Sequence, residues 1–168
     1  PLLEMDVPTH TAVCILADKE ETGSDGNTGM QGAFLEYFID DIAAAFDEKG
    51  HHVLSNSICL SADVNAALDP LYPEVMVASN AAKVNYGVCI TKYTGGASKG
   101  GTNDASAEYM GQIRNILDQN DVLWQTGELG KVEAGGGGTV AKYISMLDVD
   151  TVDLGVPVLS MHAPMEIV

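Results

Sequence analysis

Apolar and polar positions alternate along the chain in blocks that predict strands and helices in turn. A continuous apolar run at residues 11–17 predicts a strand buried on both faces. Apolar side chains then recur at helical spacing from Met30 to Phe46, and Gly50 follows as a helix stop. Further blocks predict strands at 53–60, 84–93 and 122–124, helices at 64–68, after Asn103 or Asp104, and at 139–147, and a last apolar stretch at 152–161.

This succession of strands and helices predicts an α/β fold with a mostly parallel central sheet and helices on both faces. No internal repeat and no long linker interrupts the pattern, so residues 1–168 are expected to belong to one domain. In sheets of this kind, ligand sites form in the loops at the carboxyl ends of the strands. Polar residues that directly follow apolar runs are therefore the candidates for chemistry.

Composition narrows the class of protein. With 46% hydrophobic residues and a mean hydropathy of +0.07, the 168-residue chain carries enough apolar surface to form a core. The formal net charge of −16 disfavours a nucleic-acid partner, because phosphate groups would be repelled. No apolar run is long enough to span a bilayer, so no membrane partner is expected. The three cysteines form no CxxC pair, which indicates free thiols in a cytoplasmic protein.

Carboxylates follow two of the apolar runs. Glu20 and Glu21 are adjacent carboxylates that repel each other unless a proton or a cation is present. One of them could therefore bind a metal while the other acts as a base on water, or both could belong to a solvated acidic turn. Asp63 follows the second run, where it could bind a metal or cap the helix expected at 64–68.

Two later features are also candidates. His162 ends the last apolar stretch, and a neutral imidazole there could bind zinc or serve as an ordinary core or surface residue. A glycine run precedes Thr139 and could be a flexible linker. Because a helix is expected to begin at once, the run could instead let backbone N–H groups approach a ligand at the helix N-terminus.

A rival pattern predicts a different chemistry. Residues 96–100 read Gly-Ala-Ser-Lys-Gly, which matches the GxSxG turn of α/β-hydrolases. Ser98 would then be a nucleophile, with Asp153 and His162 following in the appropriate order. The glycine and polar residues at 101–103 delay the next helix, whereas that turn requires the helix to begin immediately.

Four segments taken together resemble the M18 family of metallo-aminopeptidases, which includes the aspartyl aminopeptidases. They occur in the family's order and span nearly the whole chain. The segments are Leu-Ala-Asp-Lys-Glu-Glu-Thr-Gly-Ser at 16–24, Ser-Ala-Asp-Val-Asn at 61–65, the glycine run with threonine at 135–139, and Leu-Ser-Met-His at 159–162.

The resemblance implies a zinc exopeptidase-like fold and two divalent ions, usually zinc, that activate a water to remove the N-terminal residue of a peptide. It implies that Glu20 is the general base, that Glu21 and His162 bind one ion, and that Asp63 binds the other. Asp18, which comes just before the glutamate pair, would orient one of the metal-binding side chains. The substrate pocket would be lined by Gly136, Gly137, Gly138 and Thr139. Apart from the resemblance, the basic side chain of Lys99 near such a pocket could select acidic substrates.

The resemblance also implies parts that these residues do not supply. The family's site needs a further histidine and an aspartate that bridges both ions, and both are expected upstream of residue 1. The family's inserted assembly domain is absent, so the chain is expected to be a catalytic domain incomplete at its N-terminal side. We expect it to be inactive alone and to be part of a homo-oligomer when full length. The alternatives are the serine hydrolase and a non-catalytic metal-binding or assembly domain.

Overall fold

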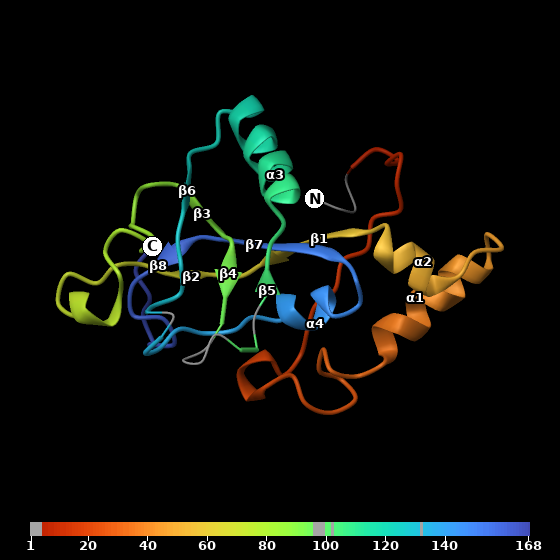
Figure 1. Ribbon diagram of the computed structural model, residues 1–168, viewed down its shortest axis with the longest axis horizontal. Helices are drawn as coiled ribbons and strands as arrows, with labels where there is room; N and C mark the ends of the chain where they lie inside the picture. The colour runs from red at the N-terminus through yellow and green to blue at the C-terminus, as the bar shows by residue number, and fades with distance from the viewer. Residues whose placement is uncertain (1–4, 96–99, 102, 132) are drawn as a thin grey trace.

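A four-stranded sheet forms the centre of the computed structural model, which describes residues 5–95, 100, 101, 103–131 and 133–168. The strand order is β1–β7–β3–β6, and Figure 1 shows β1 and β7 running side by side through the middle of the molecule. The β1–β7 and β3–β6 pairs are parallel, whereas β3 and β7 are antiparallel. The predicted α/β class with a mostly parallel sheet is thus confirmed, with one antiparallel pair added. The strands are β1 at Ile58–Ala62, β3 at Val88–Thr91, β6 at Trp124–Thr126 and β7 at Asp150–Gly155.

Short strand pairs and helices complete the described fold. β2 at Asn65–Ala66 pairs in parallel with β8 at Pro157–Val158, and β4 at Tyr93–Thr94 pairs antiparallel with β5 at Asn103–Asp104. The helices are α1 at Phe34–Ala44, α2 at Gly50–Ser55, α3 at Ala107–Gln119 and α4 at Ala141–Ser145, and single 3-10 turns are η1 at Glu20–Thr22 and η2 at Pro73–Val75.

Helices cover both faces of the sheet, because side chains alternate between the faces along each strand. On one face, α3 packs its buried Ile113 and Leu117 against Ile90 and Val152. On the other face, Ile144 of α4 packs with buried side chains of α1 and α2 and with Val149, the residue before β7. Figure 1 shows α3 and α4 on opposite sides of β7. The expectation of helices on both faces agrees with this arrangement.

The first predicted strand is wrong. Residues 11–17 have no regular structure and are exposed, with Leu16 at 93% relative exposure. A strand buried on both faces needs neighbouring strands to satisfy its backbone N–H and C=O groups. None of the described strands pairs with this segment, so its apolar pattern is not accompanied by burial.

Three other element predictions are corrected. Gly50 was expected to end a helix, but it begins α2. The strand expected at 53–60 forms only in its second half, as part of β1, because residues 53–55 belong to α2. The helix expected at 64–68 is wrong, since Asn65 and Ala66 form β2 through pairing with β8. The cap of α3 is Ser106 and not Asn103 or Asp104, which form β5.

The described residues contain no helix that is long and apolar enough to cross a membrane. Cys14, Cys59 and Cys89 all carry free thiols, as the sequence predicted.

Candidate metal centre

Glu20 and Glu21 begin η1, a single turn bounded by left-handed residues. Lys19 precedes it with φ 59°, and Gly23 and Ser24 follow it with φ 87° and 59°. Gly23 adopts this conformation at little cost because it lacks a Cβ. Its N–H donates to the carbonyl of Glu20 at 3.1 Å, and the N–H of Ser24 donates to the carbonyl of Lys19 at 2.7 Å. The sequence Glu-Glu-Thr-Gly-Ser therefore forms a closed turn that presents both carboxylates.

Asp18 lies directly before this turn and contacts residues that follow it in the chain. One of its carboxylate oxygens accepts a hydrogen bond from the hydroxyl of Thr28 at 2.9 Å, and its backbone bridges to Gly29. These contacts close the loop from Asp18 to Gly29, which contains the two glutamates.

Asp63 leaves the carboxyl end of β1 and is exposed. Its Oδ1 accepts a hydrogen bond from the N–H of Val64 at 2.7 Å. With no helix at 64–68, the helix-cap interpretation of this aspartate is wrong. Gly155, at the end of β7, lies against the backbone of Asp63: a Cβ on Gly155 would come within 1.7 Å of the carbonyl oxygen of Asp63. The absence of a side chain at Gly155 therefore allows Asp63 to occupy its position.

His162 reaches the glutamate turn from the far end of the chain. Its Nδ1 lies 3.5 Å from Oε1 of Glu21. The residue has a left-handed backbone with φ 67°, and its N–H donates to the carboxylate of Glu166 at 2.8 Å. This local bend and the contact with Glu166 hold the imidazole against Glu21.

The electrostatics of Glu20 show that the candidate residues lie together. Its pKa is raised from the ordinary value of 4.5, first by burial and then by the negative charges of Glu21 and Asp63, while His162 lowers it. The charges of Asp63 and His162 thus act on Glu20, although these residues are up to 142 positions apart in sequence. A carboxylate whose pKa is raised toward neutrality is suited to accept and return a proton.

The donor types at this cluster fit zinc, which binds carboxylate oxygens and imidazole nitrogens. Within the described parts of the chain, however, no group of three or more His, Cys, Asp and Glu side chains is arranged to hold a metal ion. Glu21 and His162 form a close pair and Asp63 lies near Glu20. The cluster matches the chemistry of a metal site and provides fewer ligands than a tetrahedral ion needs.

The glycine run forms an irregular loop directly before α4, with Gly136 and Gly138 exposed and Gly137 half-buried. Thr139 is buried, and its hydroxyl donates to Oδ1 of Asp153 at 2.8 Å and accepts from the N–H of Ala141 at 3.2 Å. Thr139 therefore anchors the loop to β7 and is hydrogen-bonded to the first residue of α4. Lys99, the residue expected to select acidic substrates, lies outside the described residues.

Asp153 and Gly155 support the candidate metal site, although the sequence pattern does not place them there. Asp153 is buried at 5% exposure beside Ser61 in the strand next to it. The signal in the sequence was a carboxylate followed two residues later by glycine inside an apolar run. Such a residue must be hydrogen-bonded when buried, and a glycine in a strand indicates a close backbone approach.

The serine-hydrolase alternative gains no support from the partners of its downstream residues. Asp153 accepts from Thr139, and His162 faces Glu21. A catalytic triad would instead join this aspartate to this histidine. Ser98 lies outside the described residues.

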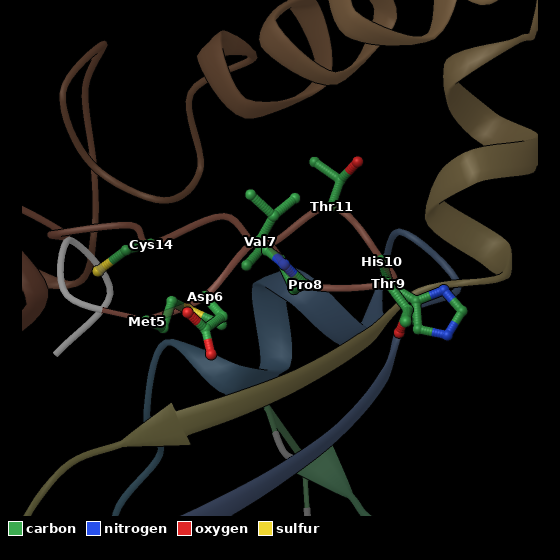
Figure 2. A pocket seen from close by; sticks show the side chains of 9 residues that line it. Met5, Asp6, Val7, Pro8, Thr9, His10, Thr11 and Cys14 are labelled. Atoms are coloured by element: carbon green, nitrogen blue, oxygen red, sulfur yellow. The ribbon is translucent and has the colours of Figure 1, made fainter.

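Two hollows of the described surface lie apart from the glutamate cluster. One of about 670 Å³ is lined by residues between Met5 and Cys14 alone, and Figure 2 shows those side chains along a single extended segment. Another of about 600 Å³ is lined by residues 13–18 and by side chains between Asn27 and Phe38. Asp18 borders the second hollow, and Glu20, Asp63 and His162 line neither one.

Acidic side chains and an imidazole lie near the carboxyl ends of strands in this α/β fold. The class of protein is therefore an α/β protein with a candidate metal-dependent active site. Residues 3–168 match the family model described as aminopeptidase I zinc metalloprotease (M18). The chain belongs to the M18 family, which confirms the resemblance drawn from its motifs.

Individual relatives agree with this assignment. A probable M18 family aminopeptidase 1 from Clostridium acetobutylicum is 48% identical over 99% of this chain and 37% of its own length. The crystal structure of an M18 family aminopeptidase from Thermotoga maritima superposes with a TM-score of 0.82 at 42% identity, over 89% of this chain and 34% of that one. A structure described as the S. cerevisiae mApe1 dodecamer matches with a TM-score of 0.65 at 28% identity, over 87% and 31% of the two chains. The chain thus spans about a third of the length of the relatives it matches.

Proposed function

We propose that this chain is the carboxyl-terminal portion of the catalytic domain of a zinc-dependent aminopeptidase that removes N-terminal residues from peptides. The observation that carries the proposal is the contact of His162 with Glu21, 3.5 Å apart, beside Glu20, whose pKa the charge of Asp63 raises. Membership of the M18 family supports it.

In this proposal, Glu21 and His162 bind one zinc ion and Asp63 binds the second. A histidine and a bridging aspartate from elsewhere in the full-length protein complete the site. When bound, the two ions polarise the scissile carbonyl and lower the pKa of the attacking water. Other divalent metals with the same preference for oxygen and nitrogen ligands could occupy the site.

Glu20 moves the proton. Its carboxylate accepts a proton from the water as the water oxygen attacks the peptide carbonyl carbon, and the protonated carboxyl then donates it to the leaving amine as the C–N bond breaks. Burial and the neighbouring carboxylates raise its pKa, which makes the carboxylate a stronger base toward the proton of the water. The loop at 136–139 borders the bound peptide, and Asp18 and Thr139 hold the turn and the loop in place.

The substitution Glu20→Gln in the full-length protein tests this assignment. We expect kcat to fall by a factor of about 100 or more, the usual contribution of a general base, with zinc content unchanged because Glu20 is not a ligand. Hydrolysis of aminoacyl p-nitroanilides and metal analysis measure both quantities. Glu36→Gln, at an exposed position in α1, is the matched control.

The same experiment separates the alternatives. A protein whose Glu20→Gln variant keeps full activity does not use this base, and one without peptidase activity in either form is a metal-binding or assembly domain. A chelator would leave a serine hydrolase active, whereas the zinc enzyme would lose activity and regain it when zinc is restored.

Two finer features belong to the same proposal. Lys99 selects acidic N-terminal residues, so the full-length protein should cleave aspartyl faster than leucyl p-nitroanilide, and equal rates would remove that role from Lys99. The full-length protein assembles into a homo-oligomer, by analogy with the dodecamer of the matched S. cerevisiae structure. Sedimentation of the purified protein measures this directly.

A further inference from the structure

The carbonyl oxygen of Gly23 is held by two side chains from different parts of the fold. The hydroxyl of Tyr143, in α4, donates to it at 3.0 Å across 120 residues of sequence. The side-chain amide of Gln31 donates to the same oxygen at 2.9 Å. A main-chain carbonyl with two side-chain donors is fixed in direction as well as in position.

The fixed position of Gly23 also restricts the turn that carries the glutamates. Its N–H donates to the carbonyl of Glu20, so Gly23 is hydrogen-bonded to Glu20 on one side and to Tyr143 on the other. Only Glu21 and Thr22 lie between Glu20 and Gly23, and left-handed residues close the turn at both ends. A displacement of Gly23 would therefore change the direction of the Glu20 side chain.

The helix that carries Tyr143 is packed into the fold. Ala141 and Ile144 of α4 are buried at 0% and 5% exposure, on either side of Tyr143 in sequence. Thr139 joins the start of the helix to Asp153 of β7 through a buried hydrogen bond. Nζ of Lys142 lies 4.5 Å from the centre of the Tyr143 ring, a cation–π contact that restrains the ring.

We propose that Tyr143 is a positioning residue that acts through Gly23 to hold Glu20 in its reactive orientation, with Gln31 as the second donor. The proposal rests on the assignment of Glu20 as the general base. Because α4 follows the glycine loop directly, it also joins the substrate-binding loop to the base: the Thr139 end is attached to the sheet and the Tyr143 end to the glutamate turn.

The first test is Tyr143→Phe in the full-length protein, which removes one hydroxyl and keeps the ring. We expect kcat to fall about fivefold, the effect of losing one neutral hydrogen bond, with KM and zinc content unchanged. Tyr37→Phe, at an exposed tyrosine in α1, should leave all three quantities unchanged. A lower melting temperature with unaltered kcat would show a purely structural tyrosine and overturn the proposal.

The second test is a double-mutant cycle with Gln31→Met, which removes the amide donor and keeps the length of the side chain. Each single variant leaves Gly23 one donor, whereas the double variant leaves its carbonyl none. We therefore expect the double variant to lose more kcat than the product of the two single losses. Simple multiplication of the losses, or a double variant equal to Gln31→Met alone, would overturn the proposal.

Failure of this inference is distinguishable from failure of the proposed function. Loss of activity in Glu20→Gln together with an unaltered Tyr143→Phe variant would reject the positioning role and keep the base. An active Glu20→Gln variant would reject both.

Discussion

Asp153 shows at the residue scale how a buried carboxylate can be tolerated beside other acids. Thr139 donates to its Oδ1, and among the described residues its Oδ2 has no hydrogen-bond partner. Burial raises its pKa above the ordinary 3.8, the hydroxyls of Ser61 and Thr139 lower it, and the charge of Asp63 raises it again. Burial has the largest effect, so the folded protein retains this proton to higher pH than the unfolded chain does.

This shift predicts how stability depends on pH. Because the folded pKa lies above the unfolded one, the contribution of Asp153 is fully present below about pH 4 and is lost as the pH rises through the folded pKa. Asp153→Asn removes this titration, so the free energy of unfolding of the full-length variant should fall less than that of the parent protein as the pH rises from 4 to 7.

Urea unfolding at a series of pH values measures the effect. Asp41→Asn, at an exposed position in α1, is the control and should follow the parent curve. A variant curve parallel to the parent curve would show that Asp153 has the same pKa in the folded and unfolded states.

At the scale of elements, α3 depends on a cap that the sequence did not identify. The Oγ of Ser106 accepts from the N–H of Tyr109 at 3.1 Å, and its hydroxyl donates to the carboxylate of Asp150 at the start of β7. Three polar residues precede the helix within a few positions. The pairing of β5 with β4 takes Asn103 and Asp104 out of cap positions and leaves Ser106 to begin the helix.

The cap predicts a measurable cost. Ser106→Ala should lower the free energy of unfolding by about 1 to 2 kcal/mol, because it loses the N-cap bond and leaves Asp150 without that donor. Ser106→Thr keeps a hydroxyl and should retain most of the stability. Chemical denaturation compares the variants, with the exposed Ser79→Ala as control. A loss equal to that of the control would show that the cap bond contributes nothing.

The elements also show which local patterns are reliable. The helical spacing of Met110, Ile113 and Leu117 predicted α3 correctly, since one face of a helix meets one core. Ala107 was expected on the same face and is exposed, whereas Tyr109 is buried there. The run at 11–17 and the segment at 64–68 were assigned wrongly. Their structure depends on whether another strand lies beside them, and β8 supplies that strand for Asn65 and Ala66.

At the scale of the whole molecule, the proposed site is shared between this chain and residues outside it. The chain spans about 37% of the length of its relatives, and its described residues gather too few ligands for a metal ion. We therefore predict that the 168-residue chain with added zinc hydrolyses aminoacyl p-nitroanilides at less than about 1% of the full-length rate, because metal-assisted activation of water requires a complete ligand set. Steady-state assays of both proteins at equal concentration check this. Robust turnover by the shorter chain would contradict the requirement for further ligands.

The amino-acid sequence by itself determined the α/β class, the family, the amphipathic helices and the chemical types of the candidate residues. These follow from side-chain period and from residue types at short spacing, which the chain carries locally. Only the tertiary structure decided that His162 meets Glu21, that Gly155 makes room for Asp63, and that Tyr143 holds Gly23. Each of these contacts joins residues that are about 90 or more positions apart in the chain. Their geometry is set by strand pairing and helix packing and not by any local pattern.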